Sequence, residues 1–155
     1  MVDPTAMVPP HLTLGERTGN PGNLRRTSTP WHGLIPLDKA TQTVFCEFES
    51  DLMGVRAMAR VILNAYRLDE CRTLTQLVAH YAPPNENDTG AYADDVSERT
   101  GIRPGAFIDP THPGELANLV RAFIYHENGR CLVSTGLIKQ AVALALNLKP
   151  GASST

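Results

Sequence analysis

Glu127 is the residue of this sequence best placed to act as an acid catalyst. Apolar residues from Leu116 to Ile124 recur at intervals of three and four, which indicates one face of a helix. Glu127 falls on that face, and Asn128-Gly129 then supplies the left-handed position that commonly ends a helix. Partial burial and the negative end of the helix dipole both disfavour an ionised carboxylate, which suits a general acid. The alternative is a frayed last turn with a solvated glutamate.

A polar loop supplies candidate ligands for a sugar. It contains Asn20, Asn23 and Arg25, and Trp31 follows shortly after it. Asparagine amides and arginine hydrogen-bond hydroxyl, acetamido and carboxylate groups, and an indole ring can stack on a sugar ring. The alternative is structural, because Asn-Pro-Gly-Asn is often only a turn and a lone tryptophan is more often a core residue.

A second polar loop runs from Tyr81 to Thr89 and is stiffened by Pro83-Pro84. Its Tyr81 and Asn87 are further candidates for substrate binding, and Glu86 is a candidate second acid or orienting group. The competing interpretation is that Asn87 to Thr89 cap the next helix and that Glu86 is a solvated loop residue.

Helical spacing elsewhere predicts the elements that position these loops. Residues 12–48 are interrupted by glycine and proline, so we expect loops there, with one short strand over Val44–Phe48 where side chains alternate. About five helices are expected: one from Ser50 to Tyr66, one from Thr73 to Pro83-Pro84, one from Asp88 or Thr89 to Gly101, the Glu127 helix, and one capped by Ser134. The fold class is therefore mainly α, with a loop-rich N-terminal third.

Length and composition bound the function. The 155 residues suit a single domain over residues 13–148, with flexible tails at 1–12 and 149–155. A net charge of −2 without a basic run argues against a nucleic-acid binder. The three cysteines lack a CxxC pair and are expected to be reduced thiols.

Several chemistries lack their motifs in the sequence. The five histidines show no metal-ligand spacing, and neither a GxSxG motif nor a glycine-rich phosphate loop is present, so no metal and no cofactor is predicted. No signal peptide and no apolar run of about 18 residues is visible, so membrane insertion is not expected.

Six motifs together resemble a known family. They are Asn20-Pro21-Gly22-Asn23-Leu24-Arg25, Trp31-x-Gly33, Phe45-x-x-Phe48-x-Ser50, Gly54-Val55-Arg56-Ala57-Met58-Ala59-Arg60, Tyr81-Ala82-Pro83-Pro84-x-Glu86-Asn87-Asp88-Thr89 with Tyr92, and His126-Glu127-Asn128-Gly129. The resemblance spans Gly19 to about Ala145 and is to bacteriophage and prophage proteins with virion or structural labels, some of which are suspected of degrading peptidoglycan. A looser likeness is to flagellar-type glucosaminidases of the lysozyme superfamily. It implies an α+β, lysozyme-like domain in which the glutamate-ended helix follows the other motifs instead of preceding them.

The leading hypothesis is a muralytic enzyme in which Glu127 protonates the glycosidic oxygen of peptidoglycan. Water or the sugar's own 6-hydroxyl would complete the reaction, as in a lysozyme or a lytic transglycosylase, and Glu86 is the preferred second carboxylate. Other possible partners are Glu47, Glu49 and Asp88. Competing hypotheses are a non-catalytic virion or glycan-binding protein and an effector acting on a host protein.

Delivery to the cell wall follows from the missing signal peptide. An endolysin would stay in the host cytoplasm until a partner holin opens the membrane, whereas a virion-associated lysin would be packaged in the phage particle with other virion proteins. The sequence favours neither route.

Overall fold

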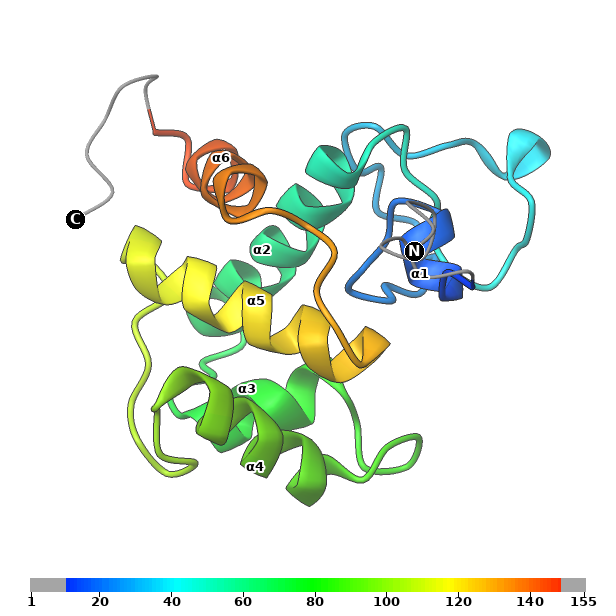
Figure 1. The fold of residues 1–155 in the computed structure, drawn as a ribbon. Helices are drawn as coiled ribbons and strands as arrows, with labels where there is room; N and C mark the ends of the chain where they lie inside the picture. The colour runs from blue at the N-terminus through cyan, green and yellow to red at the C-terminus, as the bar shows by residue number, and fades with distance from the viewer. Residues whose placement is uncertain (1–10, 149–155) are drawn as a thin grey trace, which may run out of the picture.

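The computed structural model describes residues 11–148, which form six α-helices and one short 3-10 helix (Figure 1). They are α1 (Leu14–Arg17), η2 (Leu37–Lys39), α2 (Asp51–Arg67), α3 (Leu74–Tyr81), α4 (Thr89–Thr100), α5 (Pro113–Asn128) and α6 (Thr135–Ala145). The mainly α fold class is confirmed. Of the tails predicted for residues 1–12 and 149–155, residues 1–10 and 149–155 lie outside the described residues.

Capping residues begin and end the long helices where the sequence predicts. The Ser50 hydroxyl accepts from the Met53 amide at the start of α2, and the Asp88 carboxylate accepts from the Ala91 amide at the start of α4. Gly129 has a φ of 75° and ends α5 immediately after Asn128.

The start of α5 differs from the prediction. The apolar spacing indicates a helix from Leu116, but the helix already begins at Pro113. A proline is well tolerated in the first helical turn, because amides there have no partner within the helix. Pro113 and Gly114 are residue types typical of turns, so the sequence does not reveal that they form the first turn of α5.

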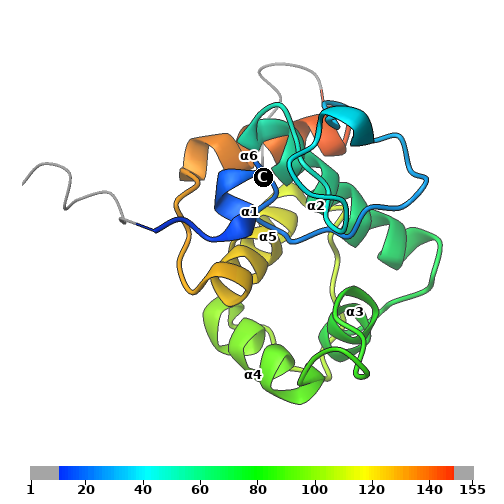
Figure 2. The ribbon, with the colours of Figure 1, turned by 90° about the vertical axis from the view of Figure 1, so that its right-hand side faces the viewer.

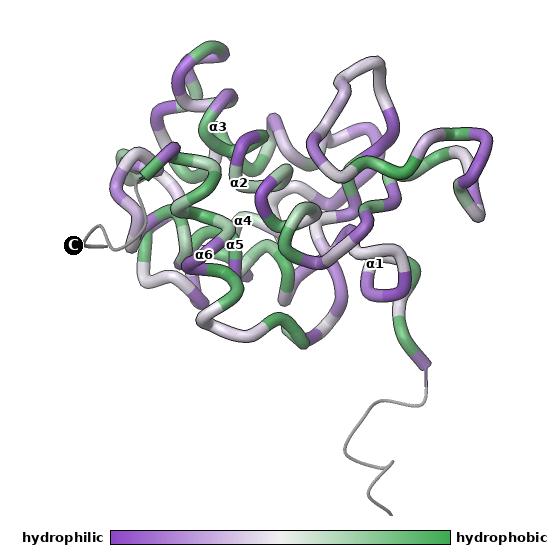
Figure 3. Tube along the Cα trace, turned by 90° about the horizontal axis from the view of Figure 1, so that it is seen from above, coloured by the Kyte–Doolittle hydropathy of each residue, from purple (hydrophilic) through white to green (hydrophobic). Residues whose placement is uncertain are grey.

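Helix α5 forms the centre of the helical part, with α2 and α6 on one side and α3 and α4 on the other (Figure 1). Its Leu119 and Phe123 are fully buried, as are Ile62 of α2, Leu77 of α3 and Ile138 of α6. Hydrophobic and hydrophilic residues are interspersed along these helices (Figure 3). The buried residues of α2, α5 and α6 recur at helical spacing, so each of these helices has an apolar side. Since burial of one large apolar side chain contributes about 1.5–3 kcal/mol, this packing fixes α5 firmly. Within residues 11–148 no helix has the length and apolarity to cross a membrane.

The N-terminal third lies beside α2 and the end of α5 and has little regular structure (Figures 1 and 2). The strand predicted over Val44–Phe48 is wrong: the segment makes only isolated antiparallel bridges, from Phe45 to Arg25 and from Phe48 to Leu34. Cys46 and Phe48 are buried on one side as the alternation suggests, but Glu47 is buried on the other. The segment over Val44–Phe48 pairs with a loop on each side, so no continuous ladder of hydrogen bonds forms.

Candidate functional site

A cleft of about 390 Å³ lies between the two polar loops and the end of α5. Its lining residues are Gly22, Asn23, Leu24, Arg25, Phe45, Val61, His80, Tyr81, Ala82, Pro83, Glu86, Asn87 and Glu127. Six of the eight site residues predicted from sequence are among them, namely Asn23, Arg25, Tyr81, Glu86, Asn87 and Glu127. The fold therefore gathers both loops and the helix-end glutamate around one cavity.

Glu127 lies in the last turn of α5 with its side chain half-buried. Its Oε1 atom accepts a hydrogen bond from Asn23 Nδ2 at 2.7 Å, and its Oε2 atom accepts one from the Tyr92 hydroxyl at 2.8 Å. The alternative of a frayed, freely solvated glutamate is therefore wrong. The two donors approach from different segments of the chain and hold the carboxylate at the edge of the cleft.

Tyr92 is the residue that the site prediction missed. It projects from α4, is buried, and makes no contact with the cleft. Burial raises the pKa of Tyr92 well above its usual range, helped by the nearby charge of Glu127, so the hydroxyl stays protonated and acts as a donor. A signal was present in the sequence, because a tyrosine on an apolar helix stripe needs a partner for its hydroxyl.

Tyr81 closes one wall of the cleft at the end of α3. Its hydroxyl donates to the Gly22 carbonyl oxygen at 2.6 Å, which ties the second polar loop to the first. Burial raises the pKa of Tyr81 as well, and the charge of Glu127 adds to this effect. The ring stands edge-on to Phe123 at 4.7 Å, so the wall rests directly on the core.

The two asparagines of the first loop have different places. Asn23 adopts a φ of 51°, a left-handed conformation that asparagine tolerates, and its amide reaches Glu127. Asn20 is buried: its Nδ2 donates to the carbonyl oxygens of Leu24 and Cys46, and its Oδ1 accepts from the Leu24 amide, all at 3.0 Å. Because Asn20 already bonds the loop backbone, its position does not fit the substrate-binding role predicted for it.

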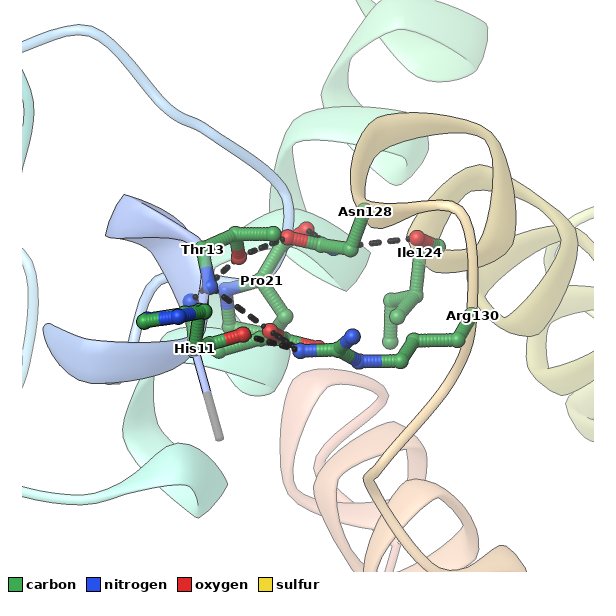
Figure 4. Close-up of polar contacts among 7 residues, drawn as sticks. His11, Thr13, Pro21, Ile124, Asn128 and Arg130 are labelled. Atoms are coloured by element: carbon green, nitrogen blue, oxygen red, sulfur yellow. Dashed lines mark hydrogen bonds and ion pairs between the residues drawn. The ribbon is translucent and has the colours of Figure 1, made fainter. Parts of the chain in front are cut away.

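Hydrogen bonds from Asn128 and Arg130 connect the end of α5 to the N-terminal third (Figure 4). Asn128 Nδ2 donates to the Pro21 carbonyl oxygen at 2.8 Å, and Asn128 Oδ1 accepts from the Thr13 hydroxyl at 2.7 Å. Arg130 binds Glu16 of α1 through Nε at 2.9 Å. Burial acts to raise the pKa of Glu16, but hydrogen bonds from Arg130 and Thr13 outweigh it and leave that pKa below its usual value. The loop carrying Asn23 is therefore fixed beside Glu127 from outside the cleft.

Trp31 does not line the cleft. It is partly buried and packs against the hydrophobic core, as the alternative interpretation of a lone tryptophan expects. Beside Tyr81, the cleft is lined by the ring of Phe45, with the Arg25 guanidinium 5.3 Å from its centroid. Sequence alone gave no reason to prefer Phe45 over Trp31 as a stacking surface.

Glu86 faces the cleft from the second loop and pairs with Arg25 of the first, with 3.5 Å between Arg25 Nη2 and Glu86 Oε1. Both side chains are about half-exposed, so the pair contributes little to stability, about 0–1 kcal/mol. Asn87 beside it donates to the Pro83 carbonyl oxygen at 3.2 Å. Both loop residues are thus accessible to a ligand in the cleft.

The other carboxylates considered as partners are occupied or remote. Glu47 is buried and accepts from the Thr41 amide at 2.7 Å and the Thr41 hydroxyl at 2.6 Å, and Asp88 caps α4. Glu49 does not line the cleft. Among residues 11–148, no three histidine, cysteine or acidic side chains gather as a metal site would need. Glu86 is therefore the carboxylate that shares the cleft with Glu127.

The chain is similar to a phage protein. It is 33% identical over 119 residues to protein P5 of Pseudoalteromonas phage PM2, and the alignment covers 74% of this chain and 71% of the phage protein. No family model matches the sequence. The similarity therefore shows that the chain is related to a phage protein.

Proposed function

This chain belongs to the family of protein P5 of phage PM2, and we propose that it is a phage-type muralytic enzyme that cleaves the glycan strand of bacterial peptidoglycan. The observation that carries this proposal is the placement of Glu127. Its carboxyl group borders an open cleft, while hydrogen bonds from Asn23 and Tyr92 fix both oxygens. The carboxyl group is thus positioned at the cleft edge, where general acid catalysis of glycoside cleavage needs it.

In the proposed reaction, protonated Glu127 gives its proton to the glycosidic oxygen as the bond from that oxygen to the sugar C1 breaks. The carboxylate left behind keeps both donors, the Asn23 amide and the Tyr92 hydroxyl, and these stabilise its new negative charge. The sugar C1 is then captured by an oxygen nucleophile, which loses its own proton to a carboxylate.

Two nucleophiles fit this scheme. Capture by water gives a reducing end, as in a lysozyme, with Glu86 available to take the water proton because it borders the same cleft. Capture by the sugar's own 6-hydroxyl gives an anhydro end, as in a lytic transglycosylase, and requires no second carboxylate. The resemblance to lysozyme-superfamily glucosaminidases is in keeping with either outcome.

Substrate contacts are proposed for the accessible residues of the cleft. Arg25 and Asn87 offer donors to carboxylate, acetamido and hydroxyl groups, and Phe45 offers an apolar ring on which a sugar can stack. Tyr81 shapes the wall between them. Asn20 and Trp31 support the loops instead of contacting the sugar.

The experiment is digestion of purified peptidoglycan sacculi by the purified chain, with the soluble fragments identified by mass spectrometry. We expect disaccharide-peptide fragments, whose reducing or anhydro ends distinguish hydrolysis from transglycosylation. If no fragment is released while the protein still binds sacculi, the chain is a glycan-binding virion protein and the enzymatic proposal is wrong.

A muralytic enzyme must also reach the peptidoglycan, and two routes are open to it. The phage relative is compatible with a protein packaged in the virion, which would meet peptidoglycan at entry together with other virion proteins. An endolysin would instead depend on a holin. Detection of the protein by mass spectrometry in purified particles would support packaging, and its restriction to infected-cell lysates would support the endolysin route.

A further inference from the structure

We propose that Asp95 and His126 act as a positioning pair that sets the place of Tyr92 and, through Tyr92, the place of Glu127. This inference rests on the proposed function of Glu127 as the acid. Neither Asp95 nor His126 lines the cleft, so neither is proposed to touch substrate. The pair joins α4 to α5 through a hydrogen bond of 2.8 Å between His126 Nδ1 and Asp95 Oδ2.

The rings of His126 and Tyr92 lie against each other. Their centroids are 3.8 Å apart and their planes are inclined by 35°, so the imidazole covers one face of the phenol ring. On another side Phe123 meets the Tyr92 ring edge-on at 5.5 Å. With the ring confined in this way, the hydroxyl has one direction in which to point, and there it donates to Glu127 Oε2.

Two polar links therefore connect α4 with the last turn of α5. Along α4, Tyr92 and Asp95 are three residues apart and lie on the same side of the helix. Along α5, His126 and Glu127 are consecutive. Each α4 residue holds one residue of α5, and the stacked rings fill the space between the links. Displacing the His126 ring would release the Tyr92 ring and with it the donor to Glu127.

The negative charge of Asp95 fixes the hydrogen bond between Asp95 and His126 in one direction. Asp95 also accepts from Arg99 Nε at 3.0 Å, and the Arg99 guanidinium lies 4.5 Å from the Tyr125 ring centroid. Burial acts to raise the pKa of Asp95, but hydrogen bonds from His126 and Arg99 outweigh it and hold the pKa below its usual value. An ionised Asp95 can only accept, so His126 must carry a proton on Nδ1, which fixes the orientation of its ring.

The test compares three variants of α4 in the full chain. Asp95→Ala removes the acceptor for His126, and we expect kcat on solubilised glycan strands to fall about tenfold with KM unchanged, because small misplacements of a catalytic group cost up to about a hundredfold. Asp95→Asn retains an oxygen that can accept from Nδ1 and should restore most of kcat. Asp94→Ala changes the exposed neighbour and should match the wild-type enzyme.

A readout that does not depend on activity separates this inference from the proposed function. The side-chain amide of Asn23 donates to Glu127 Oε1, so its NMR resonances report where the Glu127 carboxylate lies. We expect these resonances to move in Asp95→Ala and to stay in place in Asp94→Ala, whether or not the protein cleaves glycan.

Unmoved Asn23 resonances in a folded Asp95→Ala variant, or a kcat equal to that of the wild type, would overturn the positioning role. Moved resonances in a protein that releases no fragments would keep the structural link and reject the enzymatic proposal. Circular dichroism gives the folded fraction of each variant, and a loss of kcat no greater than the loss of folded protein would also overturn the role.

Discussion

The N-terminal third of the molecule and its helical remainder are held together by different forces, and Glu127 lies where the two meet. Three buried polar or charged residues, Thr18, Asn20 and Glu47, all belong to residues 11–50. In residues 51–148 most buried side chains are apolar and come from helices with one hydrophobic side, and the hydroxyl of buried Tyr92 is bonded to Glu127. Apolar packing supplies a rigid base under α5, while directional hydrogen bonds shape the loop that brings Asn23 to it.

Removing a large side chain from the helical part should give the largest loss of stability. Phe123 is fully buried under both tyrosines of the site, and Phe123→Ala should lower the free energy of unfolding by about 3–5 kcal/mol. Urea titration followed by circular dichroism measures this loss. A change below about 1 kcal/mol would mean that the helical part does not depend on its apolar packing.

Removing a buried amide should weaken the N-terminal third by a different route. Asn20→Ala leaves the Leu24 amide and the Cys46 carbonyl oxygen without their partner, while the Leu24 carbonyl oxygen still accepts from the Cys46 amide. Since an unsatisfied buried polar group costs about 1–3 kcal/mol, we expect a total of about 3 kcal/mol. Hydrogen exchange should quicken at the amides of Leu24 and Cys46, and amides of α5 should be affected less. Uniform acceleration throughout the protein would show that the two parts do not differ in this way.

A pair of helical glycines tests how closely the two parts fit. A Cβ atom on Gly54 of α2 would collide with the carbonyl oxygen of Gly19, whereas one on Gly136 of α6 would meet nothing within 4 Å. Gly54→Ala should therefore cost about 1–3 kcal/mol through forced displacement of the loop. Gly136→Ala should be neutral or stabilising by up to about 1 kcal/mol, as for an open helical site. Equal thermal midpoints for the two variants would contradict the close contact.

Acid should weaken the N-terminal third through Glu47, and this is the smallest effect expected. Hydrogen bonds from Thr41 outweigh burial and lower the pKa of Glu47 below its ordinary value of 4.5. A lowered folded-state pKa contributes stability that is present above about pH 4.5 and is lost as pH falls through the folded-state pKa. Thermal unfolding across this range should show a shallower dependence on pH for Glu47→Gln than for wild type. Identical slopes would exclude Glu47 as a source of acid sensitivity.

The same contrast explains what the sequence could reveal. Helices α2, α3, α4 and α6 follow from capping residues and apolar spacing, which are local signals. The conformation of the loops depends on contacts between residues far apart in the chain. Asn20 and Asn23 share one turn, but contacts with Cys46 and Glu127 decide which asparagine is buried and which faces the cleft.

The places of the aromatic residues also depend on contacts that the sequence does not reveal. The type and neighbours of Trp31 suit a sugar platform, but its place depends on how the loop packs on the core, and Phe45 lines the cleft instead. Tyr92 is separated from Glu127 by 35 residues, and their contact requires α4 and α5 to pack in one register.

The rate of glycan cleavage by Glu127→Gln, compared with the wild type on the same peptidoglycan, tests the role of Glu127 most directly. Glutamine can still accept a hydrogen bond from Asn23 or Tyr92 but cannot donate a proton as an acid. We expect a fall of at least about a hundredfold in rate with thermal midpoint and sacculus binding retained, and a smaller fall for Glu86→Gln. A folded Glu127→Gln variant that releases fragments at the wild-type rate would contradict the assignment.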